Sequence, residues 1–234
     1  MTTHHGLLVG AIAAAILTAS TTTGCDVADD NPHLEPVPEA HAAPPPAVDD
    51  RPREDRAAAI ARGEKLVTFG GCNDCHTPWK STPGGPMPDM TRMLSGHPEG
   101  APDPEGTIGP NDMVLIGPTF TSFRMPFGVI YSQNLTPDPD TGLGSWTEQM
   151  FLDTFRKAKH MGGGGRPILP PMPWPNVASL PDEDLRAIFA YLQSIPPIRN
   201  AVPLLELPSE IESAIDGGNQ QILRDMASHR NGGG

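Results

Sequence analysis

Three kinds of residue are scarce in this chain, and each scarcity argues against a class of protein. Aromatic residues make up 5% of the 234 positions, whereas 29 prolines and 25 glycines indicate long irregular segments around one small folded domain. Basic residues are outnumbered 28 to 16, and a net charge of −12 disfavours binding to nucleic acid. Cysteine occurs three times, and an odd number does not suit a disulfide framework.

The amino-terminal end has no basic residue before Arg51, yet it contains an apolar run from Gly6 to Ala19. That run has the length of a signal-peptide core and is too short to span a bilayer comfortably. It ends in Ser-Thr-Thr-Thr-Gly-Cys, which resembles a bacterial lipoprotein cleavage box. We therefore expect residues 1–24 to be a lipoprotein-type signal peptide and Cys25 to carry the lipid anchor, with ordinary signal cleavage as the alternative.

Residues 25–53 are rich in proline, alanine and aspartate and show no apolar periodicity. They predict a disordered or polyproline-like tether between a membrane anchor and the folded domain. His33 and His41 lie in this tether, and we interpret both as solvated side chains.

Helical periodicity predicts three helices in a domain that spans residues 54–203. The expected helices are Glu54–Phe69, Ser145–His160 and Leu180–Ser194. Gly70 and Gly71 are expected to end the first helix. Thr147 is the expected N-cap of the second helix and Gly162 its stop, while Pro181 suits the first turn of the third.

The segment at about residues 78–126 has a proline every few positions, which disfavours long helices and central strands. Short elements are expected only around Thr91–Leu94 and Val114–Ile116. So long an insert needs a core to wrap around. In the C-terminal tail, residues 204–234, the sequence predicts only weak helices, at Pro208–Ala214 and Asn219–Ala227.

The five residues Cys72-Asn73-Asp74-Cys75-His76 allow four interpretations: a zinc half-site, a redox dithiol, a chance pair of free thiols, or a haem attachment point. A redox pair normally opens a helix after a strand, but here a helix precedes it. A structural zinc needs two more ligands, and the other histidines show no paired spacing. In the haem interpretation, both thiols form thioethers with the porphyrin and His76 is the proximal ligand. The sequence therefore favours one covalent haem c.

A sixth ligand for the iron must come from far along the chain. Met172 lies in Ile-Leu-Pro-Pro-Met-Pro-Trp-Pro-Asn, where prolines fix the backbone and can hold a thioether toward the open face of the iron. Four other side chains remain as alternatives, namely Met161, Met125, His97 and His160.

Further residues are candidates for the surroundings of the haem. Five aromatic side chains are candidates for the pocket wall: Trp79, Phe127, Tyr131, Trp146 and Trp174. Asn134 and Arg124 are candidates for hydrogen bonds to the haem propionates, with ordinary core or loop roles as the alternative.

Taken in order, these motifs resemble a class I c-type cytochrome with a single haem. Three stretches resemble the cytochrome domains of membrane-bound alcohol and gluconate dehydrogenases: Tyr131–Phe151, Leu169–Trp174 and Leu180–Pro197. The resemblance covers about residues 56–203. It implies a mainly α cytochrome c fold, with three main helices around the haem and long loops rich in proline and glycine. It also implies that Met172 binds the iron and that Gly63 faces the last helix near Tyr191.

The resemblance also has limits, because those dehydrogenase subunits carry three Cys-x-x-Cys-His motifs and this chain carries one. The resemblance implies an electron carrier rather than an enzyme. It also implies a location in the bacterial periplasm or cell envelope, with the protein held to the membrane if Cys25 is lipidated. Its partners would be a redox donor and a redox acceptor, and its acidity suits a partner with a basic rim. Two alternatives stay open: a haem enzyme or sensor with an open sixth position, and a fixed subunit of a dehydrogenase or oxidase complex.

Overall fold

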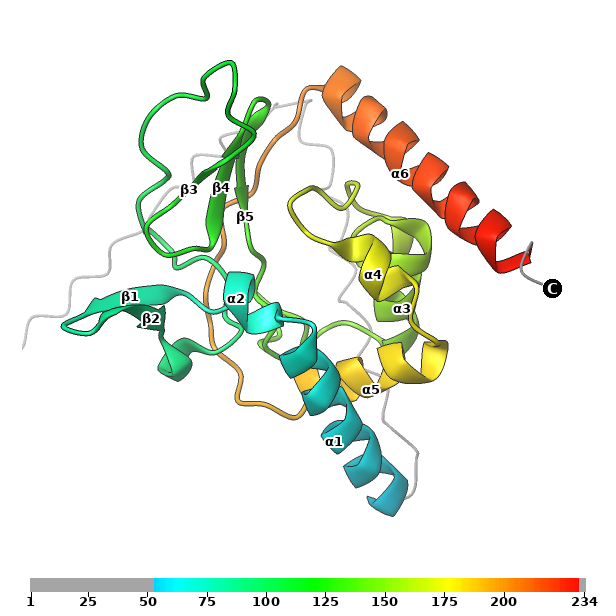
Figure 1. Cartoon of the computed structure of the whole chain (residues 1–234). Helices are drawn as coiled ribbons and strands as arrows, with labels where there is room; N and C mark the ends of the chain where they lie inside the picture. The colour runs from blue at the N-terminus through cyan, green and yellow to red at the C-terminus, as the bar shows by residue number, and fades with distance from the viewer. Residues whose placement is uncertain (1–52, 232–234) are drawn as a thin grey trace, which may run out of the picture. The chain divides into compact units, whose positions relative to one another are not determined.

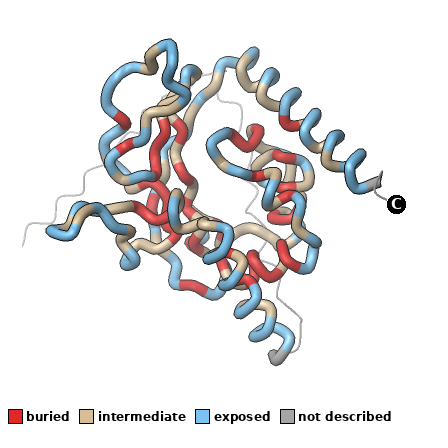
Figure 2. Tube along the Cα trace, in the orientation of Figure 1, coloured by how far each residue is buried: buried red, intermediate tan, exposed pale blue. Residues whose placement is uncertain are grey.

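The three helices expected from the sequence are all present in the computed structural model, which describes residues 53–231 (Figure 1). They are α1 (Arg53–Phe69), α3 (Glu148–Lys157) and α5 (Asp182–Leu192). α5 packs against both α1 and α3. The buried residues gather along α3 and α5 and, in a second group, around residues 121–136 (Figure 2). The expected signal peptide, Cys25 and the tether up to residue 52 lie outside the described residues.

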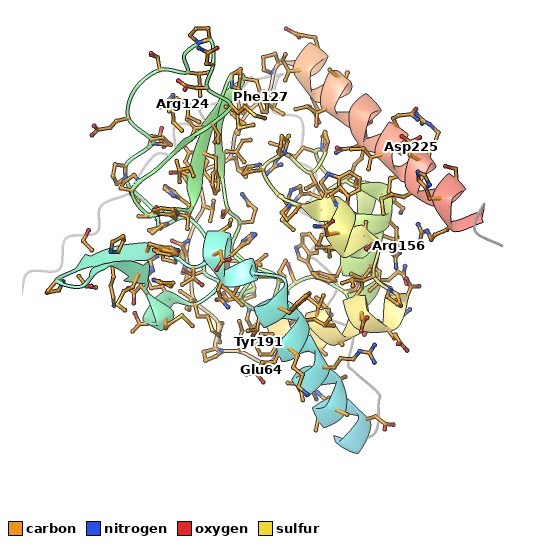
Figure 3. The ribbon with its side chains drawn as sticks, viewed as in Figure 1. Glu64, Arg124, Phe127, Arg156, Tyr191 and Asp225 are labelled. Carbon is orange, nitrogen blue, oxygen red and sulfur yellow. The ribbon has the colours of Figure 1, made fainter. Side chains whose placement is uncertain are left out.

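The crossing of α1 and α5 depends on a glycine. A Cβ atom added to Gly63 would lie 2.0 Å from the carbonyl oxygen of Ala187 and 2.8 Å from Cβ of Tyr191. Gly63 therefore faces the last helix of the domain near Tyr191, as expected. Figure 3 shows Tyr191 beside Glu64, the next residue along α1.

α3 begins where the sequence predicts but ends earlier. The Thr147 side chain caps it by accepting a hydrogen bond from the backbone N–H of Met150 at 3.1 Å. The expected stop at Gly162 is wrong, because Ala158 already adopts the left-handed conformation with φ 53° and directs its N–H back to Phe155. Gly162 instead lies in η2 (Met161–Gly163), a short 3-10 helix.

The hydrophobic core lies where α3 meets α5. The ring centroid of Phe151 is 5.2 Å from that of Phe155 and 5.3 Å from that of Phe189 on α5. Leu185 and Leu192 of α5 are fully buried in the same cluster. Pro181 is the N-cap of α5 rather than part of its first turn, and three acidic residues follow it at the positive end of the helix.

The Pro-rich insert contains more regular structure than its composition suggests. β1 (Trp79–Thr82) and β2 (Gly85–Pro88) form an antiparallel ribbon. β3 (Leu115–Ile116), β4 (Ser122–Met125) and β5 (Gly128–Tyr131) form an antiparallel sheet with β4 in the middle. The expectation of no central strand is wrong, because β4 is a short run between two prolines that contains none itself. The fold is therefore helical with some sheet.

The sequence predicts two short elements in the insert, and the structure contains an element at each of the two positions. η1 (Met90–Arg92) is a 3-10 helix that overlaps the expected Thr91–Leu94, and β3 falls within Val114–Ile116. The insert is tied to the end of the domain by Asn200, which is buried. Its amide nitrogen donates to the carbonyl oxygens of Ser95 at 2.7 Å and His97 at 2.8 Å. The insert is thus part of the domain rather than a loose loop.

The C-terminal tail is one long helix, α6 (Ser209–Asn231), and not two weak ones. It runs through Gly217 and Gly218, which cost helix stability, so tertiary contacts must compensate. Asn219 supplies such a contact, because its buried side chain donates to the carbonyl oxygens of Ala158 and Ile168 at 3.5 and 3.0 Å. No helix among residues 53–231 is both long and apolar enough to cross a bilayer.

Candidate functional site

The Cys-x-x-Cys-His motif forms a single helical turn, α2 (Cys72–His76), directly after α1. α1 closes with a hydrogen bond from Gly70 N–H to the carbonyl oxygen of Leu66 at 2.8 Å. Gly71 then adopts φ 65°, a conformation that glycine reaches without strain, and this reverses the chain into α2. The two glycines therefore end the first helix as expected and fix where the motif starts.

Both thiols of α2 are free and half-buried. Burial raises the pKa of the Cys72 thiol to about 11, and burial together with the charge of Asp74 raises the pKa of Cys75. A redox dithiol needs the opposite, since its attacking cysteine has a lowered pKa. Among the described residues no three His, Cys, Asp or Glu side chains gather as a metal cluster would require. The structure thus gives the redox and zinc interpretations no support in this part of the chain.

His76 is held in the geometry of a metal ligand. Its Nδ1 donates to the backbone carbonyl oxygen of Gln133 at 2.8 Å, which fixes the ring and leaves Nε2 as the atom able to bind a metal. Burial lowers the pKa of His76 and so favours the neutral imidazole that metals bind. The carbonyl oxygen of His76 accepts from Gly96 N–H at 2.8 Å, so the whole turn is anchored to the insert.

Met172 borders the same hydrophobic cluster as Cys72, although the two residues lie a hundred positions apart. It is half-buried, and its N–H donates to the carbonyl oxygen of Leu169 at 3.3 Å. The preceding Pro170–Pro171 peptide bond is cis, and α4 (Trp174–Ala178) starts two residues after Met172. The structure therefore brings Met172 and Cys72 to one core.

The alternative sixth ligands lie in different settings. Met161 is 59% exposed on η2. Met125 closes β4 in the sheet. His97 is fully buried, and its Nδ1 shares a hydrogen bond of 2.9 Å with the Thr121 hydroxyl. His160 lies within electrostatic range of the motif, because the charge of His76 contributes to lowering its pKa.

The two candidates for propionate binding are occupied by protein partners. The Asn134 amide nitrogen donates to the carbonyl oxygen of Ile198 at 2.8 Å, and its oxygen accepts from Thr136 N–H at 3.0 Å. Arg124 donates from Nε and Nη2 to the carbonyl oxygen of Pro104 at 3.1 and 2.8 Å. Both residues therefore have structural roles in the described chain.

The five aromatic wall candidates are spread over the domain. Trp79 stacks on Phe120 with ring centroids 4.9 Å apart, and its indole N–H donates to the Asp74 carbonyl oxygen of α2 at 3.2 Å. Trp174 is buried in the core, and Trp146 packs against the same cluster. Tyr131 lies beside His97, with ring centroids 4.9 Å apart.

Phe127 lies outside the neighbourhood of the motif. It forms the turn between β4 and β5, and Figure 3 places it with Arg124 at the hairpin end of the sheet, away from α2. Trp79 is thus the wall candidate that bonds directly to α2, and Trp146 and Trp174 are the candidates that border the core of Met172.

Two site features escaped prediction from the sequence. His76 donates its hydrogen bond to the backbone carbonyl oxygen of Gln133. Every residue has such a carbonyl, so this acceptor cannot be identified from the amino-acid sequence. Arg166 lies between a run of glycines and the Met172 loop, and it acts electrostatically on His160. A lone basic residue in an otherwise apolar and glycine-rich loop is a signal that could have drawn attention to it.

The residues of α2 and Met172 together fit a covalently bound haem: two free thiols on one turn, an oriented neutral imidazole, and a thioether at the same core. That ligand set defines a c-type cytochrome centre. No family model matches the chain. Comparison with individual known proteins nevertheless supports this class.

Several curated relatives are similar over much of the chain. It is 36% identical over 154 residues, 64% of its length, to the cytochrome c subunit of alcohol dehydrogenase (quinone) from Gluconobacter oxydans. It is 29% identical over 154 residues to the gluconate 2-dehydrogenase cytochrome c subunit of Pantoea cypripedii, and 28% identical over 168 residues to the fructose dehydrogenase cytochrome subunit of Gluconobacter japonicus. These matches cover 64% and 70% of the chain, and the chain spans only about a quarter of the length of each of the three relatives. Cytochrome subunits among the relatives support an electron-transfer cytochrome rather than a catalytic subunit.

Proposed function

We propose that this protein carries single electrons through one haem c, attached by Cys72 and Cys75 and bound by His76 and Met172. The observation that carries the proposal is the hydrogen bond from His76 Nδ1 to the Gln133 carbonyl oxygen. It fixes the imidazole ring so that Nε2 would be the atom to bind the iron of a haem held by the two thiols of the same turn. The similarity to cytochrome c subunits of dehydrogenases supports the same conclusion.

The residues of the site suit electron transfer. When bound, the haem supplies an iron that changes by one electron between two oxidation states. His76 and Met172 come from segments fixed by backbone hydrogen bonds, so both ligands can hold their positions in either state. A thioether ligand and an apolar surrounding both favour the reduced iron and raise its potential.

The place of action is the bacterial cell envelope in this proposal. Support comes from the apolar leader and from the lipoprotein-like Cys25, both of which lie outside the described residues. Covalent attachment of haem also suits an exported protein. The membrane contact would then be made by the lipid on Cys25, with residues 25–53 as the tether.

A second candidate function is a fixed electron-transfer subunit of a larger dehydrogenase. The names of the relatives favour it, because all three described above are cytochrome subunits of dehydrogenases. The chain spans only about a quarter of each, so a permanent place in a complex is not implied by the similarity alone. Purification from native membranes with and without detergent, followed by mass spectrometry, separates a stable complex from a free carrier.

The test of haem binding is expression with a cytochrome c maturation system. We expect the mass of the purified protein to exceed that of the polypeptide by one haem, and Cys72→Ala with Cys75→Ala to abolish the increase. A colourless protein of bare polypeptide mass would overturn the proposal.

The test of the sixth ligand compares two methionines. Met172→Ala is expected to convert the oxidised protein from a low-spin to a high-spin spectrum and to lower the reduction potential, because the iron loses its thioether. Met161→Ala is the matched control, since Met161 is exposed on η2, and it should keep the wild-type spectrum. A high-spin spectrum in the wild type would favour an enzyme or sensor instead.

A further inference from the structure

Arg166 is a half-buried cation that has no carboxylate within ion-pair distance among the described residues. The side chain makes one hydrogen bond to the described residues, from Nη1 to the carbonyl oxygen of the next residue, Pro167, at 3.2 Å. The half-buried Arg156 and Arg186 differ, because they pair with Asp182 and Glu148. Most of the donors of the Arg166 guanidinium therefore lack an acceptor from the described part of the protein.

The loop that carries Arg166 is anchored beside the candidate haem site. His160 N–H donates to the carbonyl oxygen of Arg166 at 2.9 Å, and Gly165 N–H donates to that of His160 at 2.9 Å. The charges of Arg166 and His76 both help to lower the pKa of His160, so each of these two side chains lies within electrostatic range of His160. Met172 follows six residues later on the same segment.

A cation in this position is costly without an anion. Burying a charge that lacks a partner destabilises the folded state, because the charge loses part of its hydration. Burial lowers the pKa of Arg166, and the charge of Glu212 on α6 acts in the opposite direction. The neighbouring Asp216 is already paired with Lys159 at 2.9 Å. The described residues thus supply one carboxylate that acts on Arg166 at a distance and none that pairs with it.

We propose that Arg166 donates to a propionate carboxylate of the haem and that the carboxylate of Glu212 partly balances its charge. The inference rests on the proposed function, because it requires the haem on α2. Haem carries two carboxylates, and a guanidinium can donate to one of them through two parallel N–H groups. Arg166 takes this place because Arg124 and Asn134 are held by Pro104 and Ile198.

The test measures the reduction potential of the haem-loaded protein as a function of pH. Arg166→Gln removes a positive charge beside the haem, so we expect a lower potential. The reduction equilibrium should fall by at least about threefold, or about 28 mV, because tenfold corresponds to about 59 mV for one electron. Without its cation the propionate should also titrate closer to neutral pH, which gives a steeper decrease of the potential with rising pH.

Three further variants separate this role from a merely structural one. Arg166→Lys keeps the charge and should restore the wild-type pH profile. Glu212→Gln removes the opposing charge and should raise the potential. Arg224→Gln is the control for net charge, since Arg224 is exposed on α6 and bonds to Gln221 of the same helix, and it should shift the potential less than Arg166→Gln does.

Each outcome decides the proposal. A wild-type potential and pH profile in Arg166→Gln would overturn it, as would equal shifts in Arg166→Gln and Arg224→Gln. If Arg166→Gln fails to acquire haem, Glu212→Gln decides: a raised potential supports the role of Arg166, and an unchanged one overturns it. A wild-type protein without covalent haem would instead overturn the proposed function, so the two failures are distinguishable.

Discussion

Gly63 sits where α1 crosses α5, at a point with no room for a side chain. Gly63→Ala would place a methyl group 2.0 Å from the backbone oxygen of Ala187, and a backbone atom cannot rotate away. The two helices must then separate, so we expect a loss of about 1–3 kcal/mol in the free energy of unfolding. Urea denaturation of both proteins measures it.

The control for this substitution is another helical glycine. Gly217 lies in α6, and an added Cβ there meets nothing within 4 Å. Gly217→Ala should stabilise the helix by roughly 0.5–1 kcal/mol, because alanine has the higher helix propensity. Equal effects of the two substitutions would show that propensity, and not the helix crossing, governs Gly63.

His160 gives the protein a predictable sensitivity to acid. Burial, then the charge of Arg166 and that of His76, lower its pKa from the ordinary 6.5 to about 3. Between these two pH values the unfolded chain binds a proton that the folded chain does not, so stability falls as the pH falls. The slope from this one group is at most about 1.4 kcal/mol per pH unit.

The measurement is urea unfolding at a series of pH values below neutrality. His160→Gln should lose the slope that His160 contributes, while His229→Gln, at an exposed position of α6, should keep it. If His160→Gln shows the same slope as the wild type, the acid sensitivity comes from another group.

At the scale of elements, α6 is held to the domain by a few polar contacts. Asn219 bonds two carbonyl oxygens of the segment after α3, Gln220 bonds the Lys157 carbonyl oxygen at 3.2 Å, and Asp216 pairs with Lys159 at 2.9 Å. Asn219→Ala should weaken the docking of α6 by about 1–2 kcal/mol, because a buried hydrogen-bonded group is lost. The centre of the domain should hardly change.

Amide hydrogen exchange followed by mass spectrometry resolves the two regions. We expect faster exchange over α6 in Asn219→Ala and unchanged exchange over α1 and α5. Gln221→Ala is the matched control, since the Gln221 side chain bonds to Arg224 and Asp225 within α6. Faster exchange throughout the domain would mean that α6 is part of the cooperative core.

At the scale of the whole molecule, a net charge of −12 should govern encounters with redox partners. Electron transfer to a basic acceptor protein should slow several-fold when the ionic strength rises from about 0.01 to 0.15 M, since salt shortens the range of attraction from about 30 to 8 Å. Stopped-flow rates measure this effect. An acidic acceptor should show the opposite trend, and rates independent of salt would exclude electrostatic steering.

Much of this protein follows from local patterns in the sequence. α3 and α5 lie near their expected positions because apolar residues recur in them at helical spacing, and Thr147 marks the start of α3. α1 lies near its expected position because its residues have high helix propensity and the Gly70–Gly71 pair marks its end. The motif Cys72–His76 indicates haem attachment when it is taken together with the apolar leader, the preceding helix and a distal methionine. Met172 remains a prediction as the sixth ligand, and the sequence pointed to it through its surrounding prolines.

Tertiary structure decided the rest, because the deciding contacts join residues that are distant in the chain. β4 has a partner on each side, and cross-strand pairing overcomes the prolines that flank it. α6 continues through Gly217 and Gly218 while Asn219 anchors it to the segment after α3. The orientation of His76 depends on a carbonyl group 57 residues away, and the lack of a carboxylate partner for Arg166 among residues 53–231 is visible only in the folded chain. Local spacing determined which groups could bind a haem, and packing decided which of them lie around one core.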